Sequence, residues 1–176
     1  MKLNLGCQIH HFPGWTNVDI VGDDPNIQVE INAPAEKLPI ENDSVDFIYA
    51  GHLVEHYYPD TLKLALAEWY RVLRPGGTLA ILTPDCGAIM RDFASGQIGM
   101  EATWQQLYGR IYSYDRSEER HHIAFDYGTL FAETSRIFDP LKIRPFDLQH
   151  PPQELEPFMG EHISRGAYQV GVICQK

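Results

Sequence analysis

Residues 43–85 read DSVDFIYAGHLVEHYYPDTLKLALAEWYRVLRPGGTLAILTPD, and this stretch decides the fold. An apolar strand, a short polar turn, a long helix, a glycine-rich stop and a second apolar strand follow one another. This order predicts a βαβ unit with a right-handed crossover. The histidines and the glutamate of GHLVEH, residues 51–56, come directly after the first strand. Because ligands of open parallel sheets bind outside the carboxyl ends of the strands, we expect this cluster at a binding crevice.

The helix of this unit is predicted over Asp60–Leu73. Its apolar residues recur at helical spacing on one face: Leu62, Leu66, Trp69 and Leu73. Pro59 favours the helix start, and the Arg-Pro-Gly-Gly sequence of residues 74–77 ends the helix. The flanking strands are predicted over Val45–Ala50 and Thr78–Leu82.

Three shorter apolar runs upstream predict further strands over Lys2–Cys7, Asn17–Val21 and Ile27–Ile31. The Gly-Asp-Asp-Pro sequence of residues 22–25 predicts a turn between the last two strands. Compact apolar runs of this kind are typical of parallel strands that are covered by helices on both faces.

Downstream of the βαβ unit the pattern changes to helix over residues 86–114. A stripe of apolar residues at helical spacing is expected to pack into the core, with Tyr108 or Tyr112 alternatively facing a cleft. The stripe consists of Trp104, Leu107, Tyr108, Ile111 and Tyr112. The polar, charge-rich residues 113–126 predict an exposed loop or lid, and residues 129–138 predict a second crossover helix.

Two strand-like runs, Lys142–Leu148 and Ala167–Cys174, close the chain. The first contains Pro145, which cannot donate to a strand ladder and therefore indicates an edge strand. The second run has no proline. We therefore predict a central last strand that pairs antiparallel with an edge strand.

The composition excludes several classes of protein. The chain has 176 residues, enough for one domain with a substantial core, and it has no apolar run of membrane-spanning length. The formal net charge of −10 disfavours nucleic acid as a partner, because phosphate binding needs a concentrated positive surface. Cys7, Cys86 and Cys174 show no CxxC spacing, which disfavours a disulfide framework and indicates a reducing cytoplasm.

Three motifs carry a resemblance to a known family. They are GWTNVD at residues 14–19, GHLVEH at residues 51–56 and ExxRVLxPGG at residues 68–77. With these motifs the chain resembles the small class I S-adenosylmethionine-dependent methyltransferases, of the type-11-like methyltransferase domain, most strongly over residues 3–85. The resemblance implies an α/β fold. That fold is a Rossmann-like, seven-stranded, mostly parallel sheet with an antiparallel last strand and helices on both faces.

The resemblance also implies a function. S-adenosylmethionine is the expected cofactor, and a small molecule is the expected methyl acceptor, with a sugar or a surface-polysaccharide intermediate as the family-level guess. Residues 1–176 are expected to form a single methyltransferase-like domain, in which residues 86–126 are a helical or lid insertion. A cytoplasmic protein without nucleic-acid or membrane partners is expected, and homo-oligomerisation is left open.

The family's cofactor-binding positions map onto the ends of the first four strands. They are Leu5, Gly6, Cys7 and Gln8 after the first strand, Asp19 and Ile20 after the second, Asn32 and Ala33 after the third, and Gly51 and His52 after the fourth. Asp19 is implied to accept hydrogen bonds from the ribose hydroxyls, since an ionised carboxylate is acceptor-only and takes two donors. The residues after the third strand are implied to lie near the adenine, and those after the first and fourth strands near the methionine part and its sulfonium.

The first loop departs from the family's pattern. Gln8 and His10 stand where glycines are common, and Asn4 replaces an acidic residue. Glycine is used in such loops because the backbone approaches the cofactor and often adopts a positive φ. Gln8 is therefore expected to cost strain or space. A non-catalytic module of the same fold, which acts through a protein partner, is the alternative function.

Several residues are candidates for proton transfer. His121 and His122 lie in the charged loop and could supply a general base, while His56 and Glu55 qualify by their position at a strand end. The segment from His52 to His56 also matches the HxxEH motif of inverted zincins, which makes zinc hydrolysis a third alternative. That chemistry needs both histidines on one face of a continuous helix, whereas this motif follows a strand and a proline soon breaks any helix. No metal site is therefore predicted.

Overall fold

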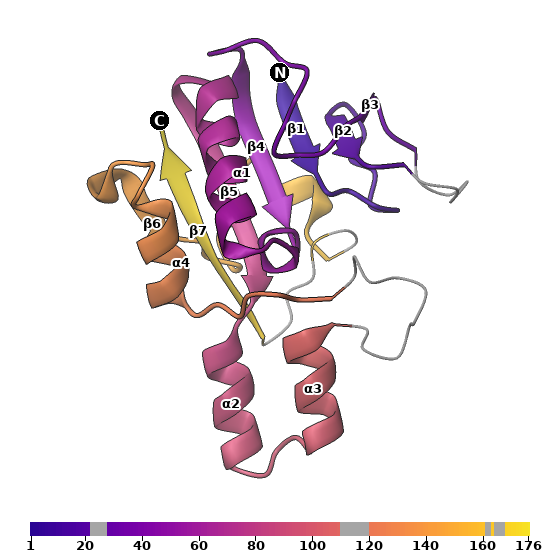
Figure 1. The fold of residues 1–176 in the computed structure, drawn as a ribbon, viewed down its shortest axis with the longest axis vertical. Coiled ribbons are helices and arrows are strands. Elements are labelled where there is room, and N and C mark those ends of the chain that lie inside the picture. Colours follow the sequence, from indigo (N-terminus) through magenta and orange to yellow (C-terminus); the bar gives the residue numbers. More distant parts are fainter. Residues whose placement is uncertain (22–27, 110–119, 161–162, 164–167) are drawn as a thin grey trace.

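Seven strands form one mixed sheet in the described part of the computed structural model, which comprises residues 1–21, 28–109, 120–160, 163 and 168–176 (Figure 1). The strands are β1 (Lys2–Leu5), β2 (Thr16–Asp19), β3 (Ile31–Asn32), β4 (Val45–Gly51), β5 (Leu73–Pro84), β6 (Ile143–Pro145) and β7 (Gln169–Gln175). Their order is β3-β2-β1-β4-β5-β7-β6, with β7 antiparallel to both of its neighbours and the other pairs parallel. The predicted Rossmann-like fold class is confirmed.

Helices cover the sheet unequally on its two faces. The α-helices are α1 (Pro59–Val72), α2 (Cys86–Ala94), α3 (Met100–Tyr108) and α4 (Tyr127–Thr134), and the 3-10 helices are η1 (Val54–His56), η3 (Pro140–Lys142) and η4 (Glu156–Phe158). Helices α1 and α4 share one hydrophobic cluster with the strands. The opposite face packs aromatic side chains of the β1–β2 loop against Phe158 of η4, and the ring centroids of Phe12 and Phe158 lie 3.9 Å apart.

Helix α1 forms where the apolar periodicity predicts it. Leu62, Leu66 and Trp69 are buried on the sheet, so the helix is stabilised mainly by this apolar face. On the other side of the helix, Arg71 donates to both carboxylate oxygens of Glu68, each at 2.7 Å. Oε1 of Glu68 also accepts from the Leu38 N–H at 2.7 Å. This ion pair is structural, since it holds the β3–β4 connection against the helix.

Strand β5 is longer than predicted, because the chain turns into it directly at Leu73. The pairing with β4 shifts between Val45 and Phe47, so the Arg-Pro-Gly-Gly residues bulge out of the ladder. Gly76 has a φ of 79°, and a Cβ at Gly77 would lie 3.0 Å from the Val45 carbonyl oxygen. The two glycines therefore make room for a bulge rather than a loop.

The C-terminal strands lie where Pro145 predicts them. β6 is an edge strand, and β7 is inserted antiparallel between β5 and β6. In the second crossover helix Leu130 is buried, and Phe138, just beyond its end, is buried in the same cluster. None of the helices in the described ranges has the length and apolar character to cross a bilayer.

The prediction that the apolar stripe of residues 104–112 packs into the core is wrong for its described residues Trp104 and Tyr108. Trp104 and Tyr108 are exposed, whereas Thr103 on the neighbouring side of α3 is buried. Figure 1 shows why: α2 and α3 form a hairpin that projects beyond the sheet, so α3 has little core to pack against. Ile111 and Tyr112, the turn at residues 22–25 and the charged residues 113–119 lie outside the described residues.

Several element bounds also differ from prediction. β1 ends at Leu5 and β2 at Asp19, two residues earlier than expected in each case. β3 comprises Ile31 and Asn32, which lie at the end of the predicted run or just beyond it. Residues 86–108, where the sequence predicts helix, form two helices, since the chain reverses between Ala94 and Met100.

Gly171 in the centre of β7 yields a test of the sheet packing. It pairs with Leu82, and a Cβ on it would collide with the Ile81 carbonyl oxygen and lie 2.9 Å from the Phe146 Cβ. We expect Gly171→Ala to lower the free energy of unfolding by about 3 kcal/mol, because a central ladder cannot shift easily. Gly99→Ala, where a Cβ meets no atom within 4 Å, is the matched control. Equal denaturant midpoints for the two variants would contradict this packing.

Candidate active site

The turn after β1 depends on a glycine. Gly6 has a φ of 64°, and a Cβ on it would lie 2.9 Å from Cδ1 of Leu53, which follows β4. A side chain at this position would therefore be strained and would also have to displace the Leu53 side chain. The result is a cradle of backbone at the carboxyl ends of β1 and β4, where ligands of such sheets bind.

Gln8 adopts a strained backbone conformation, which is one of the two costs that the sequence leaves open. Its φ is 44°, its side chain is exposed, and its backbone N–H donates to Oδ2 of Asp19 at 2.7 Å. The Ile20 N–H donates to Oδ1 of the same carboxylate at 2.7 Å. Each carboxylate oxygen retains a second acceptor position, so two hydroxyl donors can still bind there. The cost at Gln8 is thus strain in the backbone rather than lost space.

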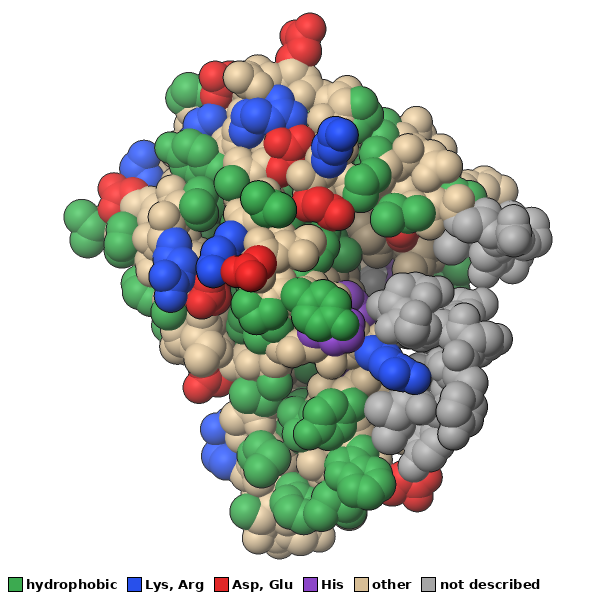
Figure 2. Space-filling view, viewed as in Figure 1, with side chains coloured by type: hydrophobic (Ala, Val, Ile, Leu, Met, Phe, Trp, Pro, Cys, Tyr) green, Lys and Arg blue, Asp and Glu red, His purple; other side chains and the backbone are tan. Residues whose placement is uncertain are grey.

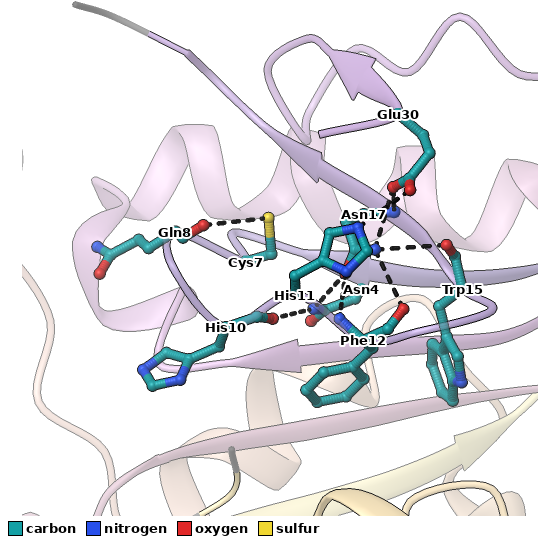
Figure 3. A network of polar contacts seen from close by, with 9 residues as sticks. All are labelled: Asn4, Cys7, Gln8, His10, His11, Phe12, Trp15, Asn17 and Glu30. Carbon is teal, nitrogen blue, oxygen red and sulfur yellow. Dashed lines mark hydrogen bonds and ion pairs between the residues drawn. The ribbon is translucent and has the colours of Figure 1, made fainter. Parts of the chain in front are cut away.

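A buried amide pair holds the rest of this loop (Figure 3). Nδ2 of Asn4 donates to the His10 carbonyl at 2.8 Å and to Oδ1 of Asn17 at 2.9 Å. Oδ1 of Asn17 also accepts from the Phe12 N–H at 2.8 Å. A carboxylate at position 4 could not donate these two bonds. The asparagine that departs from the family's pattern is therefore matched to the shape of this loop.

Glu30 completes the network from the strand-β3 side. Its Oε2 accepts from the backbone N–H of Asn17 at 2.7 Å and from Nδ2 of Asn17 at 3.0 Å, and its Oε1 lies 3.1 Å from Nε2 of His11. Desolvation opposes ionisation, but these hydrogen bonds outweigh it and lower the pKa of Glu30 to about 2. The carboxylate is thereby kept ionised and tied to β2.

The expected adenine-side residues have structural bonds of their own. Oδ1 of Asn32 accepts from the Val21 N–H at 3.0 Å, and the Ala33 N–H donates to the Asp19 carbonyl at 3.1 Å. These bonds turn the chain after β3 back toward the end of β2. They place Asn32 and Ala33 beside Asp19, and their role toward a cofactor stays a prediction.

The turn after β4 is also strained. His52 has a φ of 53°, its side chain is exposed, and its N–H donates to the Leu82 carbonyl at 2.7 Å. A Cβ at Gly51 would collide with the hydroxyl of Tyr49. Strain of this kind is a common feature of functional turns. It aims the residues after β4 across the sheet end toward Gly6.

Glu55 is the buried charge of the site. Its side chain is 1% exposed, and its Oε2 accepts from Oγ1 of Thr83 at 2.9 Å. Desolvation disfavours the ionised form, but the nearby His52 and His56 rings hold the pKa of Glu55 below its usual value. Thr83 at the end of β5 was missed from the sequence. A polar residue closing an apolar strand was the signal available there.

The histidines after residue 120 divide into two environments. His121 meets His56 edge to face, with ring centroids 4.9 Å apart, whereas His122 stacks on Tyr58 at 4.0 Å. Desolvation lowers the pKa of His121, so this ring is neutral around pH 7. The structure therefore joins His56, His121 and Glu55, and it places the His122 ring against a surface tyrosine.

The backbone of residues 122–123 is hydrogen-bonded to η1. The N–H groups of His122 and Ile123 both donate to the Glu55 carbonyl, at 2.7 and 3.2 Å. Beside them lies a small cavity of about 10 Å³, lined by Glu55, Thr83, Pro84, Cys86, Gln106, Leu107, His121, Ile123 and Ala124. A cavity of this size holds about one water molecule. Histidine side chains, purple in Figure 2, reach the molecular surface on this face.

The zincin arrangement of the HxxEH motif does not form. η1 spans a single turn, Val54–His56, and Tyr57 is already extended with a ψ of 149°. His52 and His56 are thus not on one face of a continuous helix, as the proline in the sequence indicates. Burial raises the pKa of the Cys7 thiol to about 12, so Cys7 stays a neutral thiol at pH 7. Cys86 is half-buried.

Residues 17–81 match the family model described as a methyltransferase domain. Malonyl-[acyl-carrier protein] O-methyltransferase of Pectobacterium atrosepticum is 34% identical over 74 residues, which is 42% of this chain and 25% of that protein. The chain thus spans about a quarter of the length of this curated relative.

Solved structures share the fold over nearly the whole chain. An S-adenosylmethionine-dependent methyltransferase of Thermotoga maritima superposes with a TM-score of 0.62 at 17% identity, covering 99% of this chain and 81% of that one. The 1,6-didemethyltoxoflavin-N1-methyltransferase of Burkholderia thailandensis, solved with 1,6-didemethyltoxoflavin and S-adenosylhomocysteine bound, gives 0.59 at 15% identity, covering 99% and 70%.

Asn4→Asp tests the amide pair. We expect this change to lower the free energy of unfolding by about 2–3 kcal/mol at pH 7, because a buried carboxylate then faces two acceptor oxygens. The loss should shrink in acid, where a protonated Asp donates one of the two bonds. Asn42→Asp is the control, since Asn42 is exposed and only accepts from Arg71. Denaturant unfolding at both pH values measures the difference, and an unchanged Asn4→Asp stability contradicts the network.

Glu30→Gln tests the carboxylate that ties β3 to β2. The folded pKa of about 2 lies below the ordinary value of 4.5, so ionised Glu30 stabilises the fold above pH 4.5. This advantage over the glutamine variant should fall as the pH drops from 4.5 toward 2. Chemical unfolding of both proteins across this range measures it. A stability difference that is constant with pH would overturn the assignment.

The matched segment and the seven-stranded topology together confirm the resemblance found in the sequence, which is to the class I S-adenosylmethionine-dependent methyltransferases.

Proposed function

We propose that this protein transfers a methyl group from S-adenosylmethionine to a small-molecule acceptor. The observation that carries the proposal is the backbone cradle at Gly6, which lies beside a carboxylate, Asp19, that retains free acceptor positions. The matches to a methyltransferase domain favour this reading over a non-catalytic module. A sugar or a surface-polysaccharide intermediate is our proposal for the acceptor class.

The chain's residues would hold the cofactor at the ends of β1, β2, β3 and β4. Asp19 would accept hydrogen bonds from the ribose hydroxyls. Gly6 would let the backbone approach the methionine part, and Asn32 and Ala33 would border the adenine. When bound, S-adenosylmethionine supplies an electrophilic methyl group on its sulfonium. The protein's main contribution to rate is then alignment of the acceptor with that methyl group.

The acceptor would lie over the ends of β4 and β5, where the polar groups of Glu55, His56 and His121 meet. A neutral imidazole can take a proton from an acceptor hydroxyl, and His121 is held neutral by burial, which lowers its pKa. His56 has the same capacity by position. His122 would contribute through its stack on Tyr58, at the rim of this region.

The charge and the cysteine content support our proposals for the partners and the cellular location of this protein. The net charge of −10 does not suit nucleic acid, and the three free cysteines suit a reducing cytoplasm. We propose one domain over residues 1–176, in which residues 86–126 cover the acceptor. Pairing with a second copy of the chain remains a proposal to be tested by its mass in solution.

Calorimetry with S-adenosylhomocysteine tests the cofactor site. We expect the wild type to bind with micromolar affinity and Asp19→Ala to lose at least about tenfold, because a hydrogen-bonded hydroxyl pair loses its charged acceptor. Gln8→Gly should bind at least as tightly as the wild type, since glycine adopts the positive φ without strain.

Asp147→Ala, which removes an exposed carboxylate far along the chain, is the matched control. Equal affinity of Asp19→Ala and this control would contradict the ribose assignment. Failure of both the wild type and Gln8→Gly to bind would reject the cofactor proposal itself. Binding by Gln8→Gly alone would show that the strained loop has weakened the site.

A further inference from the structure

Three metal-ligating side chains converge at the ends of β4 and β5. One ligand atom each from Glu55, His56 and His121 lies within 4.8 Å of the other two. The first two residues belong to η1, and the third comes from the distant segment that docks on it. Two imidazoles and a carboxylate form a donor set that suits a divalent transition metal.

The carboxylate is oriented with one oxygen unused. Thr83 fixes Oε2 of Glu55, whereas Oε1 is buried and accepts no hydrogen bond from the described residues. Nδ1 of His52 lies 3.3 Å from Oε1 as an ion-pair contact. Because a buried carboxylate oxygen without a hydrogen bond costs free energy, this atom calls for a further positive partner.

Neighbouring groups of the fold orient both imidazoles. Nδ1 of His56 lies 3.2 Å from the Arg120 carbonyl oxygen, and the His121 ring packs edge to face on the His56 ring at 4.9 Å. A ring nitrogen that donates to a carbonyl carries the proton, so the other nitrogen presents its lone pair. Metal-binding histidines are held in this way in most metal sites.

We propose that Glu55, His56 and His121 bind one divalent transition-metal ion such as Zn²⁺, with an open position for the acceptor. A tetrahedral site with bonds of about 2.1 Å separates its ligand atoms by about 3.4 Å. Since the three ligand atoms lie within 4.8 Å of one another, they have to approach by at most about 1.4 Å on binding. This ligand set differs from the zincin motif, since His121 replaces His52.

The site would select an acceptor with a hydroxyl group, and this part of the inference rests on the proposed function. A hydroxyl oxygen bound to the metal ionises more easily, as metal-bound water does. Its O–H bond breaks and the proton passes to solvent water, so with the metal bound His56 and His121 act as ligands in place of the general-base role. The oxygen then forms a bond to the methyl carbon while the carbon–sulfur bond breaks, and the electron pair remains on sulfur as a neutral thioether.

Cobalt binding tests the site independently of activity. The chelator-treated chain of residues 1–176 is titrated with Co²⁺, and visible absorption reports coordination by the protein. We expect one Co²⁺ per chain in the wild type and affinity at least about tenfold weaker in both Glu55→Gln and His121→Ala. His122→Ala is the matched control, because its ring stacks on Tyr58 outside the cluster. Circular dichroism checks that each variant is folded.

The outcomes separate this inference from the proposed function. Absence of Co²⁺ binding by the wild type overturns the site, as does wild-type affinity in either ligand variant. Equal losses in His122→Ala and in the ligand variants overturn it as well. If either ligand variant fails to fold, His56→Ala takes its place under the same criteria. Calorimetry with S-adenosylhomocysteine, measured in parallel on metal-free protein, reports on the cofactor alone.

Discussion

The buried hydrogen bond between Asn4 and Asn17 is the constraint on which the rest of this structure depends. It joins β1 to β2 inside the sheet end, where neither amide can reach water. A single lost partner would leave several buried polar groups unpaired, at about 1–3 kcal/mol for each. Once this pair has formed, it restricts the backbone conformation of the loop between the two strands.

That loop serves both faces of the sheet. On one side it places Phe12 and Trp15 against the aromatic cluster of the second face, in edge-to-face and stacked contacts. On the other side it holds Gln8 at a positive φ so that its N–H reaches Asp19. The strain at Gln8 is thus offset by hydrogen bonds elsewhere in the loop, which is how strained turns persist in folded proteins.

Much of this could be predicted from the sequence. The spacing of Leu62 and Trp69 predicts a helix because burial of one helix face follows from periodicity alone. Pro145 predicts the edge strand because its missing N–H is a local property. The predicted burial of the stripe at Trp104 was wrong because burial depends on the rest of the fold and not on a local property. Periodicity shows that α3 is amphipathic, but it does not show whether a core lies beside it.

The sequence by itself determined the βαβ unit and the family resemblance, since each depends on residues that are close along the chain. The tertiary structure decided that Gln8 costs strain rather than space, since its φ is 44°. Only the tertiary structure decided that Glu55 meets Thr83 and that His121 joins His56 while His122 does not. Those contacts link segments that local patterns do not connect. The two histidine contacts arise because the N–H groups of His122 and Ile123 donate to the Glu55 carbonyl of η1, and the direction of each ring follows from that docking.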